Sequence, residues 1–168
     1  VRAEFSPLMI GDKNYALLQR IKATWDPKNI FNPGKIVNAP PMDESFRYEP
    51  DQETRELKTL MDFSETGGIL RAAEKCNGSG DCRKTHLSGG TMCPRYMATR
   101  SEKETTRARA NILREMLTRS TRDNPFSHKE IYEVMDLCLS CKRCASECPS
   151  NVNIASMTAE FLHQYYQA

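Results

Sequence analysis

The chain has 168 residues, of which 39% are hydrophobic and 27% charged, a composition typical of folded globular domains and unlike that of disordered chains. Its 24 Lys and Arg residues nearly balance 22 Asp and Glu residues, so the net charge of +2 does not indicate nucleic acid as a partner. No apolar run is as long as a membrane span and the first residues lack the regions of a signal peptide, so we expect a cytoplasmic protein without membrane-spanning segments. Because residue 1 is Val and an apolar helical pattern is still running at Ala168, we interpret the chain as a part of a longer protein.

The first predicted element is a helix over residues 14–25, whose apolar residues lie close to one face: Tyr15, Leu18, Ile21 and Trp25. Asp26-Pro27 ends this pattern, because the residue before a proline is disfavoured in the α region. Asn32-Pro33-Gly34 is typical of a turn. The following stretch contains three prolines and no sustained period, and it predicts a linker over residues 38–54.

Residues 55–168 carry mostly helical patterns and almost no strand signals, so the predicted fold class is mostly α. We expect helices over residues 55–63, 68–75, 102–119 and 127–137, and a last one from residue 153. Ser127 is the expected N-cap of the fourth helix, since Glu130 follows three residues later as in a capping box. The third helix has one expected buried stripe, formed by Ala108, Ile112, Met116 and Leu117. The last helix has its apolar face at Ile154, Met157, Phe161, Leu162 and Tyr165.

The most informative feature of the sequence is its seven cysteines, an odd number that argues against a disulfide framework in a chain without a secretion signal. Four of them form the motif C-x2-C-x2-C-x3-C-P, at Cys138, Cys141, Cys144 and Cys148. Three thiolates at this spacing can hold one iron-sulfur cluster, while the fourth, followed by proline, binds the other cluster of a two-cluster protein. A structural zinc site would not need the third cysteine or the Cys-Pro, so the motif favours iron-sulfur chemistry.

A second, less regular cysteine group lies upstream, where Cys76 and Cys82 are followed after ten residues by Cys93-Pro94. Ser79 occupies the place of the middle cysteine. The crossed ligation rule then predicts one cluster, of the 4Fe-4S type, on Cys138, Cys141, Cys144 and Cys93. It predicts a second cluster on Cys76, Cys82 and Cys148, so that all seven cysteines are used as four and three.

The second cluster lacks one thiolate, and three outcomes follow: a 3Fe-4S cluster, a 4Fe-4S cluster completed by Ser79 or another donor, or a labile iron. We favour the 3Fe-4S cluster. Asp81 and His86 are the other candidate donors, although a turn position and a polar loop explain them equally well. His128 and His163 are better explained as surface or packing residues. Arg100, Arg107 and Arg109 precede or lie on the helix over residues 102–119, and we interpret them first as surface residues and second as a docking patch.

Basic residues lie within two positions of several cysteines and could stabilise an anionic cluster, as could close approach of the backbone at Gly78 and Gly80. The basic residues in question are Lys75, Arg83, Lys84, Arg95, Lys142 and Arg143. Exposure to solvent alone explains the presence of any single basic residue, so the two glycines are the more specific indication of a cluster.

Two stretches of the sequence carry a resemblance to a known family. IKATWDPKNIFNPGKIV, residues 21–37, looks like the closing segment of the C-terminal domain of FAD-linked oxidases. CNGSGDCRK, MCPRYMATR and CLSCKRCASECPSNV look like an appended helical ferredoxin-like domain. Together they resemble FAD-linked D-2-hydroxyacid dehydrogenases with a fused iron-sulfur region, which act on D-lactate, glycolate or D-2-hydroxyglutarate.

The resemblance implies residues 1–37 as the tail of a flavin oxidase domain, 38–54 as a linker and 55–168 as a helical two-cluster iron-sulfur domain. It implies an upstream FAD domain on the same polypeptide that oxidises the substrate, and clusters that pass the electrons to a quinone or another electron carrier. Asn32 matches the family position near flavin and substrate. The full-length protein would be cytoplasmic or peripheral at the inner membrane, and the fragment alone would hold no catalytic residue.

Two other functions remain open from the sequence alone. A zinc-stapled helical binding domain would be colourless and would hold zinc without sulfide. An iron-sulfur sensor or interaction module would use the incomplete second site as a labile switch that changes a contact with a partner.

Overall fold

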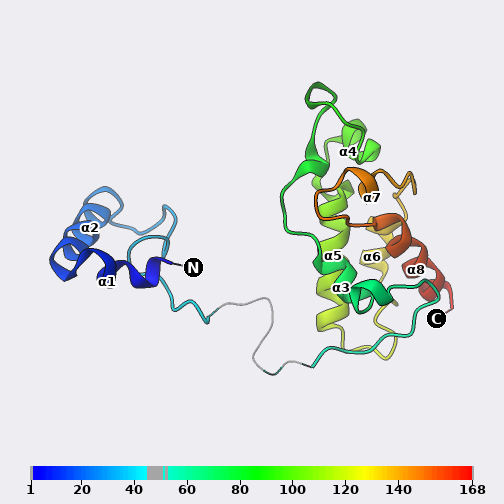
Figure 1. Cartoon of the computed structure of the whole chain (residues 1–168), viewed down its shortest axis with the longest axis horizontal. Helices are drawn as coiled ribbons and strands as arrows, with labels where there is room; N and C mark the ends of the chain where they lie inside the picture. Colours follow the sequence, from blue (N-terminus) through cyan, green and yellow to red (C-terminus); the bar gives the residue numbers. More distant parts are fainter. Residues whose placement is uncertain (1, 45–50, 52, 168) are drawn as a thin grey trace. The chain divides into compact units, whose positions relative to one another are not determined.

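The computed structural model describes residues 2–44, 51 and 53–167, and the chain divides into two compact units, Val1–Gln52 and Glu53–Ala168 (Figure 1). Every regular element of the described residues is an α-helix or a short 3-10 helix, as a mostly α chain requires. No helix among these residues is both long and apolar enough to cross a bilayer. The predicted linker includes residues 45–50 and 52, which lie outside the described residues, so its extent stays a prediction.

The N-terminal unit contains the 3-10 turn η1 (Ala3–Phe5) and the helices α1 (Ser6–Ile10) and α2 (Asp12–Trp25), followed by an irregular segment. The predicted helix over residues 14–25 is confirmed, and it begins two residues earlier because Gly11, with φ of 78°, separates it from α1. Asp26 stops α2 and organises the next turn, since its carboxylate accepts hydrogen bonds from the backbone N–H groups of Ile30 and Phe31, both at 2.9 Å. Lys22 pairs with the same carboxylate.

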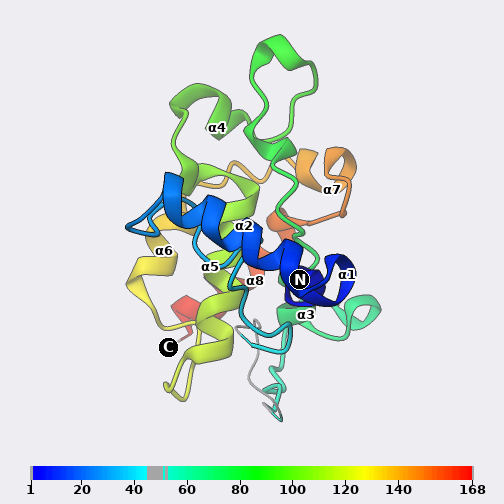
Figure 2. The same ribbon diagram turned by 90° about the vertical axis from the view of Figure 1, so that its left-hand side faces the viewer.

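The C-terminal unit is a small helical bundle in which α5 (Thr106–Arg119) contacts α3 (Ile69–Glu74), α6 (Lys129–Met135) and α8 (Ile154–Tyr166). Its core contains large side chains with at most 1% of their surface exposed: Ile69, Leu113, Ile131, Met135, Ile154 and Phe161. Two shorter helices, α4 (Pro94–Thr99) and α7 (Arg143–Glu147), gather at one end of this unit (Figures 1 and 2). The remaining turns are η2 (Ser64–Thr66), η3 (Asp81–Arg83), η4 (His86–Ser88) and η5 (Glu102–Glu104).

The predicted helix over residues 55–63 is wrong, because this segment is irregular up to η2. Its backbone finds partners on α8 instead of within a helix. The fully buried carboxylate of Glu160 accepts hydrogen bonds from the N–H groups of Leu60, at 3.0 Å, and Met61, at 2.8 Å. A side chain 100 positions away thus overrides the local helical pattern. The helix predicted over residues 68–75 is confirmed as α3, from Ile69 to Glu74.

The predicted helix over residues 102–119 is interrupted. η5 ends at Glu104, Thr105 has extended backbone angles, and its hydroxyl caps α5 by accepting a hydrogen bond from Ala108 N–H at 2.9 Å. Of the predicted buried stripe, Leu117 is buried, while Ile112 and Met116 pack half-buried against the core. Ala108 is only half-buried, and the buried positions are Thr106, Arg109, Ala110, Leu113 and Leu117.

The last two predicted helices have different outcomes. α6 begins at Lys129 after His128, without a side-chain cap, so the predicted Ser127 capping box is wrong. α8 begins as predicted, since the Asn153 side chain accepts a hydrogen bond from Ser156 N–H. The predicted apolar face of α8 is confirmed: Ile154, Met157 and Phe161 are buried, and Leu162 and Tyr165 pack against the core.

Candidate metal-cluster sites

All seven cysteines are free thiols, and they separate into two groups, each lining one cavity. Cavity one is lined by Cys93, Cys138, Cys141 and Cys144. Cavity two is lined by Cys76, Cys82 and Cys148. The tertiary structure therefore takes one cysteine from each sequence motif and brings it to the other motif, in the four-and-three division that crossed ligation requires.

Left-handed backbone conformations turn the cysteine-bearing loops toward cavity one. Cys93 has φ of 57° and directly precedes Pro94, which begins α4. Ser140 and Lys142 have φ of 49° and 62°, so the chain reverses direction between Cys138 and Cys144. Non-glycine residues rarely adopt this conformation, so the course of both loops depends on the tertiary contacts that hold these residues.

Cavity one is electropositive. The backbone N–H groups of Ile154 and Ala155, at the N-terminus of the 13-residue helix α8, lie close to the Cys144 sulfur and act to lower its pKa. Arg109 from α5 and Lys142 also line the cavity. Burial nevertheless raises the pKa of the Cys144 thiol, because desolvation disfavours a thiolate that has no cation bound to it. Such a thiol becomes a good ligand once a metal replaces its proton.

Cavity two has a different set of donors. Burial raises the pKa of the Cys82 thiol, opposed by a hydrogen bond from Arg107 N–H at the start of α5. Gly80 lines the cavity with φ of 83°, but a Cβ there would meet only the Gly78 carbonyl oxygen, at 3.9 Å, so the close approach of the backbone expected at Gly78 and Gly80 stays a prediction. Ser79 and Asp81 bring oxygen atoms to the same cavity, and their side chains lie 3.4 Å apart.

The two cavities are neighbours. Thr106, the first residue of α5, lines both of them, and only 5% of its surface is exposed. The N-terminal turn of α5 is therefore part of the protein wall that the two sites share, and its Arg107 N–H acts on Cys82 in cavity two.

The sequence analysis missed two side chains that organise these loops. Arg109 was expected on a helix surface, but it is only 2% exposed, so that interpretation is wrong. The signal that could have found it is its position beside Ala110 and one turn before Leu113, on the buried face. Glu147 joins the two ligand loops, because its carboxylate accepts hydrogen bonds from the N–H groups of Thr91 and Met92, at 2.8 and 2.9 Å, just before Cys93.

The histidines lie outside both cavities. His86 contacts Arg100, with 3.3 Å between its Nδ1 and the guanidinium, and His128 contacts the Ser120 hydroxyl at 2.9 Å. His86 is therefore not placed with the cysteines, whereas Asp81 is. Among the basic residues near cysteines, four are paired with acids, of which only Glu104 is buried. These ion pairs are Arg83–Glu102, Lys84–Asp81, Arg95–Glu104 and Arg143–Glu147.

The cysteine geometry fits a polynuclear cluster. In the described residues no three His, Cys, Asp or Glu side chains converge on a single ion. The thiols of each group instead surround a cavity, which suits a group whose iron atoms occupy separate corners. The all-sulfur donor set of cavity one fits a 4Fe-4S cluster. A buried guanidinium nitrogen of Arg109 without a hydrogen-bond partner fits a negatively charged occupant.

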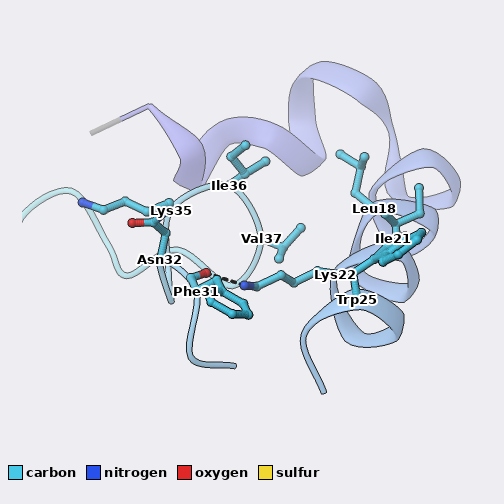
Figure 3. A pocket seen from close by; sticks show the side chains of 9 residues that line it. All are labelled: Leu18, Ile21, Lys22, Trp25, Phe31, Asn32, Lys35, Ile36 and Val37. Atoms are coloured by element: carbon cyan, nitrogen blue, oxygen red, sulfur yellow. Dashed lines mark hydrogen bonds between the residues drawn. The ribbon is translucent and has the colours of Figure 1, made fainter. Parts of the chain in front are cut away.

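Asn32 lies in the N-terminal unit, where it lines an apolar groove of about 510 Å³. Figure 3 shows Leu18, Ile21 and Trp25 of α2 on one side and the segment of Phe31 to Val37 on the other, with the Lys22 amine donating to the Phe31 carbonyl. Asn32 is exposed and has φ of 48°. The predicted apolar face of α2 therefore borders this groove, and Trp25 is 83% exposed.

Comparisons with known proteins match a segment of each unit to a different family. Residues 1–36 match the family model for the C-terminal domain of FAD linked oxidases, and residues 75–153 match the model for a 4Fe-4S dicluster domain. The similar curated proteins include D-2-hydroxyglutarate dehydrogenases from Pseudomonas putida, Pantoea ananatis and Escherichia coli, with 30, 29 and 28% identity. The alignments cover 98 to 99% of this chain but only 19% of each relative, and no solved structure shows significant similarity.

The order of the two matched segments is the order that the sequence resemblance implied, with an oxidase segment followed by a cluster domain. The expected resemblance to FAD-linked D-2-hydroxyacid dehydrogenases with a fused iron-sulfur region is thereby confirmed. The chain joins the end of an FAD-linked oxidase C-terminal domain to a helical 4Fe-4S dicluster domain.

Proposed function

We propose that this chain is the electron-transfer part of an FAD- and iron-sulfur-dependent D-2-hydroxyacid dehydrogenase. The observation that carries the proposal is the division of all seven cysteines into two adjacent cavities, four in one and three in the other. Because the N-terminal segment matches an FAD-linked oxidase domain, the electrons would come from a flavin domain on the same polypeptide. The relatives are named for D-2-hydroxyglutarate, which makes a D-2-hydroxyacid the best-supported substrate class.

Cluster one would be a 4Fe-4S cluster held by Cys93, Cys138, Cys141 and Cys144 in cavity one. Cluster two would be held by Cys76, Cys82 and Cys148 in cavity two, and we favour a 3Fe-4S cluster whose vacant corner lies beside Ser79. Three thiols satisfy three iron corners, and the Ser79 hydroxyl already lies near the Asp81 carboxylate. A serine oxygen is a weaker ligand for iron than a thiolate, so the fourth iron would be lost most easily at this corner.

The protein residues around both clusters would insulate them and neutralise their charge. The first turn of α8 brings backbone N–H groups close to Cys144, and the first turn of α5 brings one close to Cys82. Hydrogen bonds to the sulfurs favour the more negative, reduced form of a cluster. Because Thr106 lines both cavities, clusters bound in them would lie on the two sides of one helical turn, which supports direct electron transfer between them.

The redox cofactors supply the chemistry when bound: the substrate alcohol becomes a ketone, two electrons leave one at a time for a quinone or electron carrier, and two protons go to solvent. This chain's part on the flavin side would be the groove beside α2. Upstream residues of the polypeptide would cover its apolar lining, including Trp25, and the Asn32 side chain would then face the flavin and substrate. The chain's own residues perform no acid-base step.

Anaerobic reconstitution of the 168-residue chain, with iron and sulfide analysis and low-temperature EPR, tests this assignment. The expected result is about seven iron per chain and a 3Fe-4S signal in the oxidised state, since the thiols suffice for four plus three corners. Zinc bound without sulfide, or no metal at all, would refute the proposed function.

Crossed ligation has its own test in alanine variants of single cysteines. Cys93→Ala should remove the same EPR signal as Cys141→Ala, although Cys93 lies closer in sequence to Cys82. Cys148→Ala should remove the same signal as Cys82→Ala. A pairing that follows sequence proximity would contradict the assignment.

Ser79→Cys tests the second cluster. Restoring a fourth thiolate should raise the iron content to about eight per chain and make the oxidised protein EPR-silent. If the parent chain already holds eight iron and is silent when oxidised, Ser79 or another oxygen donor completes a cube, and the 3Fe-4S assignment is wrong.

A further inference from the structure

We infer that the buried guanidinium of Arg109 is the counter-ion of cluster one and raises its reduction potential. This inference rests on the proposed function, because it needs a cluster in cavity one. It concerns a residue that no cysteine motif includes and that lies on α5, between the two halves of the cluster domain in sequence.

The position of Arg109 is set by the protein and not by solvent. Only 2% of its surface is exposed. Its Nε donates to the Val134 carbonyl at 3.0 Å, and its Nη1 donates to the Glu104 carbonyl at 2.6 Å. These two hydrogen bonds, to segments before and after the helix, fix the plane of the guanidinium.

The remaining nitrogen of Arg109 has no partner. Nη2 is buried without a hydrogen bond, and no carboxylate in the described part of the chain lies within ion-pair distance of the guanidinium. The nearest acid that interacts with it, Glu104, is already paired with Arg95 at 2.8 Å, so it compensates the Arg109 charge only in part. An arginine cannot discharge by losing its proton, and a buried guanidinium with so little compensation is unfavourable. The fold therefore implies an anion at this place.

Cavity one supplies the place for that anion. Arg109 lines cavity one together with its four cysteines, and the Arg109 Nη1 lies 3.9 Å from the Cys93 sulfur. A cluster with four thiolates is anionic and has many sulfur acceptors. It would accept a hydrogen bond from Nη2 and would balance the buried charge.

The arginine of cavity two is in a different situation, which makes the effect specific to cluster one. Arg107 lines cavity two, but its guanidinium donates to the Glu102 carboxylate at 2.6 and 2.9 Å. Its charge is thus largely neutralised by a protein acid. The weakly compensated charge of Arg109 would favour the more negative reduced form of cluster one.

Redox potentiometry monitored by EPR tests the inference on the reconstituted chain. The signal that Cys141→Ala abolishes is assigned to cluster one. Arg109→Met should lower the equilibrium constant for reduction of cluster one at least tenfold, which is about 59 mV for a one-electron couple. Arg109→Lys keeps a charge but loses the planar fork, so it should give a smaller shift in the same direction.

Arg114→Met is the matched control, because Arg114 is a partly buried arginine on the same helix that contacts Asn111 and Glu115 and lines neither cavity. It should leave the potential of cluster one unchanged. If Arg109→Met does not load iron, Arg109→Lys decides alone: a lowered potential supports the inference and an unchanged one overturns it. An equal shift in Arg114→Met also overturns it. Failure of the parent chain to bind any cluster would instead refute the proposed function.

Discussion

The anchor between α8 and residues 53–63 can be broken by Glu160→Ala. Glu160 is fully buried, and its carboxylate accepts three hydrogen bonds: from Leu60 N–H at 3.0 Å, from Met61 N–H at 2.8 Å and from the Gln164 amide at 2.8 Å. The variant leaves these donors without their acceptor and releases the segment that was predicted to be helical.

The magnitude follows from the two backbone contacts. Hydrogen bonds to a charged group contribute about 1.5–3 kcal/mol each, which gives about 3–6 kcal/mol for both. Removing the carboxylate also removes the unfavourable burial of its charge, so we expect a net loss of about 2–4 kcal/mol. Since each 1.4 kcal/mol is tenfold, the local opening equilibrium should change by about 30-fold to several hundredfold.

Amide hydrogen exchange on the cluster-loaded chain measures this change. Exchange at Leu60 and Met61 should accelerate by that factor, while amides in the middle of α5 should change less, because local opening does not require the core to open. Glu133→Ala, which removes an exposed carboxylate from α6, should leave exchange at Leu60 and Met61 unchanged. Unchanged exchange in Glu160→Ala would show that the carboxylate does not hold the segment.

The remaining predictions concern the two loops and the core. Gly90→Ala should weaken iron retention more than Gly89→Ala does. Both glycines have positive φ, but only at Gly90 would the new Cβ meet the Glu147 carboxylate, at 2.9 Å, which holds the backbone just before Cys93. Equal losses would contradict this reasoning. The Lys22 amine and the turn N–H groups hold the pKa of Asp26 below its ordinary 3.8, so this turn should loosen as pH falls from 3.8 through the lower folded value. Fluorescence of the single tryptophan, Trp25, should report the loosening, and Asp26→Asn should abolish its pH dependence. Cluster removal by oxidation and chelation should leave most of the helical circular dichroism of the chain, because α5 and α8 pack through an apolar core. Complete loss of helicity would show that the clusters hold the whole fold.

Part of the site could be predicted from local sequence because its chemistry depends on spacing. Cysteines separated by two residues and followed by Cys-Pro indicate clusters whatever surrounds them, and the crossed ligation rule then groups Cys93 with the second motif. Helix α8 could also be predicted from the sequence, since Asn153 precedes it as a capping residue and Ile154, Met157 and Phe161 recur with the helical period.

Other features could not be read locally. Residues 55–63 have a helical pattern, yet Glu160 binds their backbone from the far end of the unit. The buried face of α5 agrees with the predicted stripe only in part, because α3, α6 and α8 together decide which side of it is covered. A hydrophobic period predicts that one face of a helix is buried, but the helices packed against it determine which of two adjacent faces that is.

Sequence alone therefore determined the helical class, the cluster chemistry and the link to FAD-linked oxidases, because each depends on residue types at short, fixed separations. The tertiary structure alone decided that Thr106 lies in the wall between the two cavities and that Arg109 enters one of them with an unpartnered nitrogen. The physical reason is that burial and charge compensation depend on groups far apart in the chain, which only packing brings together.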